Sequence, residues 1–139
     1  MKSKSTFSTI PTGDFVLASA SATRVRVLGR AGLKFYQFPV SIDEGALRAA
    51  GIAEDMPAQD IAVMLAEAKA AVAVQRLGNE HLVPPIYVLG CDQILVCDEI
   101  IYSKPKDIIT AKSQLSALSG KTHQLLTAAV LFQHGKRIW

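Results

Sequence analysis

The chain has 139 residues, of which half are hydrophobic and 19% are charged, and its formal net charge is +3. This composition excludes an intrinsically disordered protein and suits one globular domain that is long enough for a hydrophobic core. It also argues against a nucleic-acid-binding or membrane protein. Basic and aromatic residues form no common stripe, and no apolar run approaches the roughly 20 residues that span a bilayer.

The first part of the chain predicts two short strands around a helix. Residues 1–14 are largely polar and carry no signal-peptide pattern, so we expect a disordered lead-in there. A strand is predicted at 15–18, a helix at about 22–31 and a second strand at 35–40. Gly32 is placed as the C′ residue of the helix, because glycine adopts a positive φ at little cost.

An acidic loop is expected at 41–45, and a long helix is expected from Pro57 to about Leu77. Asp55 is the expected cap of this helix, since aspartate is favoured before a helix and proline in its first turn. The apolar face of the helix is predicted to carry Ile61, Leu65, Ala68 and Val72.

The second part of the chain predicts a long buried strand at 86–97. A short strand is expected at 100–102, followed by a helix that Asp107 caps and that runs to about Leu118. Two further strands are expected at 123–132 and 137–139. Cys91 and Cys97 lie roughly 20 Å apart on the extended strand, too far for a disulfide, so we expect a reducing, cytoplasmic compartment. The alternation of strands and helices predicts an α/β fold with a largely parallel or mixed sheet, and we expect a mixed, twisted sheet with helices packed around it.

Asp92 is a carboxylate in the middle of an otherwise apolar, β-prone run, and Gln93 follows it. Burying an unpaired carboxylate costs several kcal/mol or forces its pKa upward, so cations, a metal ion or water must surround it. Such a position is more often a functional site than an accident of packing. The alternative is that the strand ends at Cys91 and that Asp92 caps a turn.

A loop of small residues at 19–21 joins the first strand to the first helix. The hydroxyls of Ser19 and Ser21, the free N–H groups of the helix N-terminus and the guanidinium of Arg24 suit phosphate oxygens. The alternative is an ordinary serine N-cap beside a solvated arginine.

Three further charged residues are candidates for the same site. Lys69 lies near the apolar face of the long helix, so its ammonium either snorkels to solvent or reaches into a site. Glu44 follows Asp43 at the end of a predicted strand, where it either holds a divalent cation or is solvated in a loop. Lys104 precedes a proline that stiffens the backbone after the predicted hairpin.

Together these residues form the set that hydrolysis of a phosphoanhydride needs. Carboxylates hold a metal and position a water, while cations and a helix N-terminus stabilise the phosphates. The sequence contains neither Gly-x4-Gly-Lys-Ser/Thr nor Gly-x-Gly-x-x-Gly. A kinase, a P-loop ATPase and a dinucleotide enzyme are therefore disfavoured.

The same residues, in the same order, resemble the motifs of the Maf family of nucleoside triphosphate pyrophosphatases. The matching segments are Leu17–Arg24, Ile42–Glu44, Leu65–Ala70, Gly90–Gln93 with Lys104–Pro105, and Leu118–His123 with Thr127. The resemblance covers nearly all of the chain from Phe15 onward. It implies a Maf-like domain over 15–139 with a fold like that of inosine triphosphatases.

The resemblance implies hydrolysis of non-standard or modified nucleoside triphosphates to the monophosphate and diphosphate, with Mg²⁺ or Mn²⁺. It implies that Asp92 is the proton acceptor and that Glu44 and Asp92 hold the metal. The implied phosphate-binding residues are Ser19, Ser21, Arg24, Lys69 and Lys104. Thr23 and Gln93 are implied to govern substrate choice. Gln93 is similar to the branch associated with 7-methyl-GTP, whereas Thr23 departs from the usual arginine, so the base stays open.

Members of this family continue past the position of Trp139, with a segment that supplies part of the base pocket. We therefore expect a domain that is incomplete at its C-terminus, and its uncovered sheet edges predict aggregation or a homodimer. Two alternatives stay open beside the enzyme. One is a non-catalytic nucleotide-binding protein with a role in cell-division control, and the other is an unrelated α/β binding domain.

Overall fold

The computed structural model describes residues 14–79 and 87–139. These residues form four helices and a six-stranded sheet of order β2-β1-β3-β5-β6, with β4 paired to β3. The strands are β1 (Phe15–Ala18), β2 (Phe35–Gln37), β3 (Tyr87–Cys97), β4 (Ile100–Tyr102), β5 (Gln124–Gln133) and β6 (Lys136–Arg137). The helices are α1 (Ala22–Arg30), α2 (Glu44–Ala53), α3 (Ala58–Asn79) and α4 (Ile108–Leu118). None of these four helices is long and apolar enough to cross a membrane.

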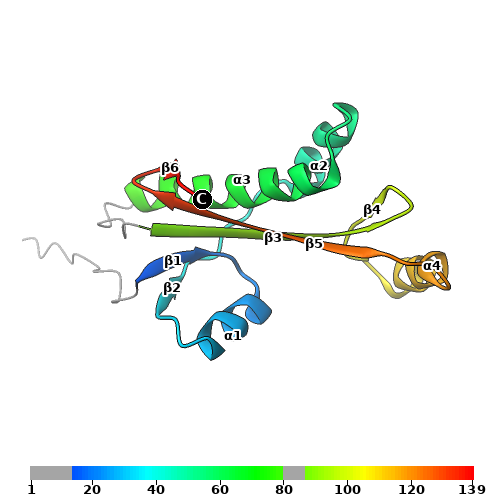
Figure 1. Ribbon diagram of the computed structural model, residues 1–139, viewed down its shortest axis with the longest axis horizontal. Coiled ribbons are helices and arrows are strands. Elements are labelled where there is room, and N and C mark those ends of the chain that lie inside the picture. Colours follow the sequence, from blue (N-terminus) through cyan, green and yellow to red (C-terminus); the bar gives the residue numbers. More distant parts are fainter. Residues whose placement is uncertain (1–13, 80–86) are drawn as a thin grey trace, which may run out of the picture.

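The sheet is mixed, as predicted. β1 pairs in parallel with β2 and β3, whereas β4 and β5 pair antiparallel with β3. α3 lies along one face of the sheet with α2 beside it, and α1 lies on the opposite side (Figure 1). α4 lies toward the end of the sheet that carries β4. This arrangement confirms the α/β class. The expected lead-in over 1–14 lies, except for Asp14, outside the described residues.

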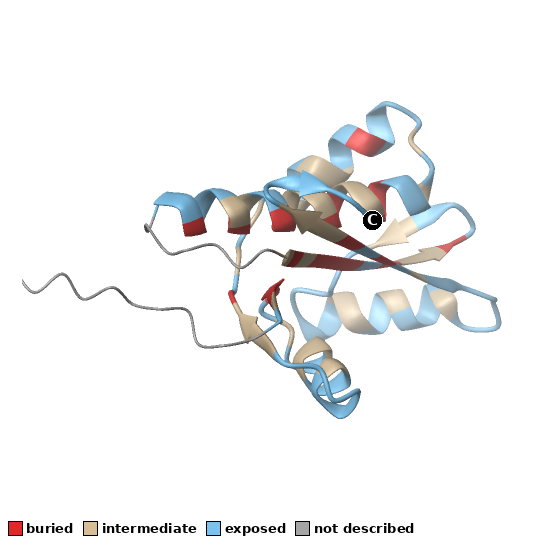
Figure 2. Cartoon of the chain, turned by 60° about the vertical axis from the view of Figure 1, so that its left-hand side comes forward, coloured by how far each residue is buried: buried red, intermediate tan, exposed pale blue. Residues whose placement is uncertain are grey.

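The core forms where α3 packs on β3. Figure 2 shows the buried residues concentrated on β1, on β3 and on the side of α3 that faces the sheet. Helices α1 and α4 carry no buried residue. Gly90 allows this close packing. A Cβ at that position would collide with the carbonyl oxygen of Ala66 and lie 2.9 Å from the Cβ of Ala70.

Several predicted boundaries are confirmed. β3 runs without interruption through Asp92, so the alternative in which the strand ends at Cys91 is wrong. Gly32 follows α1 with a φ of +77°, as the C′ position requires. Asp107 caps α4, because its carboxylate accepts a hydrogen bond from the N–H of Thr110 at 2.7 Å.

The acidic loop expected at 41–45 ends earlier than predicted: residues 41–43 lie outside the helices and strands, and helix α2 begins at Glu44. Asp43 is its N-cap and accepts a hydrogen bond from the N–H of Ala46 at 2.9 Å, so Glu44 becomes the first helical residue. Four alanines favour the helix, but two glycines within it weaken the helical pattern that the sequence presents. The prediction of a loop was therefore wrong for Glu44 and Gly45, whereas it holds for residues 41–43.

Two other boundaries also differ from the prediction. Asp55 has a φ of +53° and does not cap α3, whose first turn closes on the carbonyl oxygen of Pro57. The second strand stops at Gln37 instead of covering 35–40, and Pro39, which lacks an N–H, cannot donate to the sheet.

The buried row of α3 differs in part from the predicted apolar face. Residues four apart form that row: Ile61, Leu65, Lys69, Ala73 and Leu77. Ala68 and Val72, which the pattern placed with Ile61 and Leu65, are only half-buried. Lys69 therefore lies in the row that faces the sheet and not at its edge.

Candidate active site

Within the described residues, one edge of β3 has no paired strand in its middle, between β1 and β4. β1 ends at Ala18, opposite Gly90, and β4 pairs with β3 only from Leu95 onward. The intervening residues, Cys91–Ile94, pair with β5 on their other side. A cavity of about 870 Å³ opens here, at the carboxyl end of the parallel strand β1. Ligands of α/β folds commonly bind at this end of the strands.

The loop between β1 and α1 forms one wall of the cavity. Ser21 caps α1 and accepts a hydrogen bond from the N–H of Arg24 at 3.3 Å. The buried hydroxyl of Ser19 accepts hydrogen bonds from Ser21 N–H at 3.1 Å and from Arg24 Nη1 at 3.3 Å. Gln37 of β2 donates to the carbonyl oxygen of Ser19 at 2.9 Å. Ser21 and Arg24 line the cavity, whereas Ser19 is not among the lining residues and positions both through these two hydrogen bonds.

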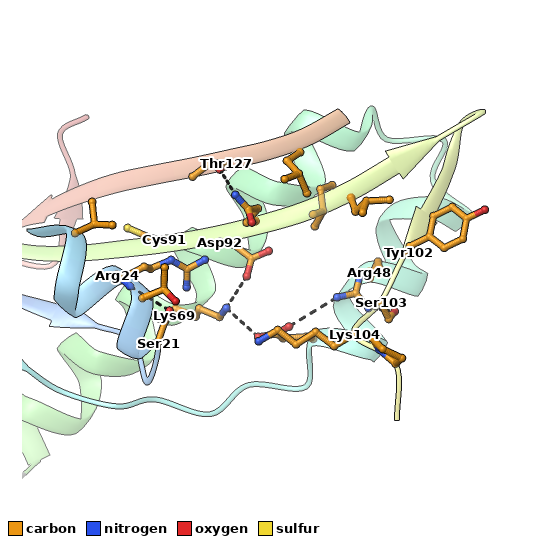
Figure 3. A pocket seen from close by; sticks show the side chains of 18 of the residues that line it. Ser21, Arg24, Arg48, Lys69, Cys91, Asp92, Tyr102, Ser103, Lys104 and Thr127 are labelled. Carbon is orange, nitrogen blue, oxygen red and sulfur yellow. Dashed lines mark hydrogen bonds and ion pairs between the residues drawn. The ribbon is translucent and has the colours of Figure 1, made fainter. Parts of the chain in front are cut away.

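Lys69 joins three elements at the floor of the cavity. Its Nζ lies 2.5 Å from Asp92 Oδ1 on β3 and 2.8 Å from Glu44 Oε1 at the start of α2 (Figure 3). The side chains of Lys69 and Asp92 are only 10% and 6% exposed. Asp92 therefore has the cation that its burial requires, and the alternative in which Lys69 snorkels to solvent is wrong.

Glu44 is the more exposed of the two carboxylates. Burial raises the pKa of Glu44, but the hydrogen bond and charge of Lys69, together with the charges of Arg48 and Lys104, outweigh it. The pKa of Glu44 consequently falls below its ordinary value of 4.5. Glu44 is thus ionised at neutral pH and points its carboxylate at the same ammonium as Asp92.

Arg48 is a cavity residue that the sequence reasoning missed. It lies one turn after Glu44 on α2, at 3.7 Å from that carboxylate, and its Nη1 donates to the hydroxyl of Ser103 at 2.8 Å. Its Nε is buried without a hydrogen-bond partner. Recognition of α2 as a helix would have placed Arg48 on the same face as Glu44, because residues four apart are neighbours on a helix.

The side chains that line the cavity carry more positive than negative charge. Its charged lining residues are four cations and two carboxylates: Arg24, Arg48, Lys69, Lys104, Glu44 and Asp92. Lys104 is exposed and enters from the segment after β4, next to the residue that Arg48 binds. A concave surface with excess positive charge attracts a polyanion and concentrates it.

The remaining wall combines an amide with apolar side chains. Gln93 lines it and donates from Nε2 to the hydroxyl of Thr127 at 2.7 Å. Thr23 lines the cavity from α1. The apolar lining residues of the cavity include Val27, Leu28, Leu95 and Leu125. An apolar surface with a few fixed polar groups is typical of sites that bind a small organic ring.

Cys91 also lines the cavity, and it is buried and free. Burial raises the pKa of the Cys91 thiol, although the charges of Arg24 and Lys69 oppose this and that of Asp92 adds to it. The thiol therefore stays protonated at neutral pH. Because the thiolate is the reactive form, Cys91 is not poised as a nucleophile.

Glu44 and Asp92 fit a divalent cation. Their carboxylate oxygens both lie within hydrogen-bonding distance of Lys69 Nζ, so they converge on a point that already accommodates a positive charge. Within residues 14–79 and 87–139, no group of three or more His, Cys, Asp or Glu could hold a metal. Mg²⁺ is commonly bound by one or two carboxylates together with substrate phosphates, and this pair matches that pattern.

Comparison with known proteins identifies the family. A family model described as Maf-like protein matches residues 14–139. The chain belongs to the Maf family. It is 40% identical over 124 residues to a nucleoside triphosphate pyrophosphatase of Ruegeria pomeroyi, and 44% identical over 124 residues to nucleoside triphosphate pyrophosphatase 1 of Jannaschia sp.. It is 41% identical over 128 residues to a 7-methyl-GTP pyrophosphatase of Mesorhizobium japonicum.

These three matches cover 89%, 89% and 92% of this Maf chain, but 59%, 60% and 61% of the relatives. The chain thus spans about 60% of the length of the curated relatives it matches. The segments on which the Maf resemblance rests are far apart in sequence. The structure brings residues from the β1–α1 loop, α2, α3, β3 and the segment after β4 around one cavity.

Proposed function

We propose that this Maf chain hydrolyses a nucleoside triphosphate to the monophosphate and diphosphate. The observation that carries the proposal is the cluster of Asp92, Lys69 and Glu44 at the floor of a cationic cavity. The names of the relatives, nucleoside triphosphate pyrophosphatase and 7-methyl-GTP pyrophosphatase, support the same reaction class. The proposal concerns the chain itself, which spans about 60% of the length of those relatives.

In the proposed reaction Asp92 accepts a proton from the attacking water. It lies on the central strand, which fixes its position, and general bases of this kind contribute typically about 100- to 10,000-fold. The water oxygen bonds to the α-phosphorus, and the bond from that phosphorus to the oxygen bridging to the β-phosphate breaks. A divalent metal, Mg²⁺ or Mn²⁺, held by Glu44 and Asp92, would supply charge neutralisation of the phosphates.

The cations of the cavity have the complementary role. Lys69, Arg24 and Lys104 would bind phosphate oxygens and stabilise charge on the departing diphosphate. The N-terminus of α1, capped by Ser21, adds a partial positive charge. Ser19 acts through Arg24, whose guanidinium it holds at 3.3 Å.

The wall that carries Gln93 is the proposed base site. The amide is fixed by Thr127, and Thr23 faces the same cavity from α1. We propose that these residues select a modified or non-standard base. The relative named 7-methyl-GTP pyrophosphatase, at 41% identity, supports a methylated guanine as the first candidate to test.

A cytoplasmic location and a homodimer are also part of the proposal. Both cysteines, Cys91 and Cys97, are free, which supports a reducing, cytoplasmic location. The exposed apolar side chains of α4, such as Ile108 and Leu115, are compatible with the homodimer expected from the sequence. Dimerisation stays a prediction.

The proposed function is tested by a panel of nucleoside triphosphates that includes 7-methyl-GTP, dTTP and UTP, each with Mg²⁺ or Mn²⁺. We expect one diphosphate and one monophosphate per triphosphate consumed, with no orthophosphate. Binding of the panel without any turnover would instead favour a non-catalytic nucleotide-binding protein. Absence of both binding and turnover would favour an unrelated binding domain.

A further inference from the structure

We infer that the cavity takes its divalent cation as a complex with polyphosphate and excludes the free cation. Lys69 is the residue responsible, because its ammonium occupies the point at which the two carboxylates converge. This inference rests on the proposed function and adds the form in which the ligand enters.

The geometry of Lys69 is the first support. Its Nζ contacts Asp92 at 2.5 Å and Glu44 at 2.8 Å, and its side chain is 10% exposed. A free cation that binds both carboxylates must displace this ammonium. A buried charge that loses its partner is strongly destabilising, so the displaced ammonium opposes the exchange.

The surroundings of Lys69 offer it no other anionic partner in the cavity. Among the described lining residues, the remaining charged groups are Arg24, Arg48 and Lys104, all of them cations. A free metal would therefore add two positive charges to a surface that already has excess positive charge. A polyphosphate reverses this balance, because its oxygens give the displaced ammonium an anionic partner.

The number of metal ligands gives independent support. The described residues provide a pair of carboxylates but no larger group of metal-binding side chains. Mg²⁺ requires six ligands in octahedral geometry and usually takes several from water and substrate phosphates. Phosphate oxygens thus serve twice, as metal ligands and as the new partner of Lys69. Metal and polyphosphate should then favour each other's binding by the same factor.

The test measures binding and does not depend on turnover. Free Mn²⁺, free tripolyphosphate and their preformed complex are titrated separately into the wild-type chain by calorimetry. We expect the complex to bind at least about 10-fold more tightly than free Mn²⁺. Equal affinity for free Mn²⁺ and the complex overturns the inference, and this comparison needs no substitution.

A substitution then assigns the effect to Lys69. The Lys69→Met variant vacates the carboxylates, so free Mn²⁺ should bind it at least about 10-fold more tightly than it binds wild type. Lys104→Ala is the matched control, because it removes the same charge from the cavity lining without a contact to either carboxylate, and it should change the affinity for free Mn²⁺ only a few-fold. Equal affinities of the Lys69 and Lys104 variants would assign the effect to net charge and overturn the role of Lys69.

Turnover of the nucleotide panel separates this inference from the proposed function. A chain that hydrolyses triphosphates and also binds free Mn²⁺ as tightly as the complex overturns the inference and leaves the proposed function standing. A chain without turnover overturns the proposed function, whatever its metal affinity.

Discussion

Lys69 shows how a single residue can define a site. An ammonium in the buried row of α3 needs anionic partners, and it has them in Asp92 on β3 and Glu44 on α2. Three elements are thereby fixed to one another by one side chain. The ammonium in turn offsets part of the repulsion between the two carboxylates, which lets them lie close together.

Glu44 should make stability depend on pH. Its pKa is lowered in the folded chain, so it contributes stability above its unfolded value near 4.5, and this contribution is lost as the pH falls through the lower folded pKa. We therefore expect Glu44→Gln to lower the melting temperature at pH 7 and to have less effect as the pH falls below 4.5. Thermal unfolding from pH 3 to 7 measures the difference in melting temperature between the wild-type chain and the variant. A difference that stays constant over that range would contradict the assignment.

The sequence could predict Asp92 because its signal is local. A charge inside an apolar, β-prone run is visible without any knowledge of the fold, and the need for a compensating cation follows from electrostatics. The position of Lys69 was less certain, because α3 is rich in alanine and periodicity separates its faces poorly. The hydrogen bond between Arg48 and Ser103 joins residues 55 apart, and no local pattern predicts such a contact.

At the scale of elements, the packing of α3 on β3 depends on Gly90. Gly90→Ala should destabilise the chain by about 1–3 kcal/mol, because its Cβ would meet the backbone of Ala66. Gly29→Ala is the matched control. Gly29 lies within α1 with no atom that a new Cβ would meet, so the substitution should leave stability unchanged or raise it slightly. Urea unfolding compares the free energies of unfolding of the two variants. Equal changes in both would contradict the close packing of α3 on β3.

Helix α2 links two walls of the cavity through Arg48. The guanidinium contacts Glu44 on its own helix and Ser103 beside Lys104, so it should hold the lysine in place. We expect Arg48→Met and Ser103→Ala each to weaken triphosphate binding. The double variant should lose less binding free energy than the two single variants lose together, since residues in contact couple by about 0.5–3 kcal/mol.

The control for this cycle is Arg26→Met. Arg26 is an exposed arginine of α1 that does not line the cavity, so its loss should leave binding unchanged. Dissociation constants for a non-hydrolysable triphosphate analogue provide the measurement. If the losses of binding free energy in the Arg48 and Ser103 variants add up in the double variant, the two residues act separately.

The elements themselves were predicted unevenly. The two long elements, β3 and α3, were found, and so were the caps at Gly32 and Asp107. α2 was missed, because its two glycines hide a helix that its N-cap and tertiary contacts stabilise. The missed helix explains the missed residue, because only a helix places Arg48 beside Glu44, one turn away.

At the scale of the whole molecule, the cavity collects charges that are distant in sequence. Residues from Arg24 to Lys104 converge because β1 stops short and leaves the middle of β3 open. The types of residue in the site were predictable from the chemistry of phosphates. Their convergence depends on strand order and on where each strand ends, which only the folded sheet defines.

The most direct test of this account compares the wild-type chain with Asp92→Asn in diphosphate release from its best nucleoside triphosphate. We predict that the rate falls by about 100- to 10,000-fold, since asparagine cannot accept the proton from water. Binding of the non-hydrolysable analogue should persist in the variant, and circular dichroism should confirm its fold. Equal rates of diphosphate release by the two proteins would contradict the central role of Asp92.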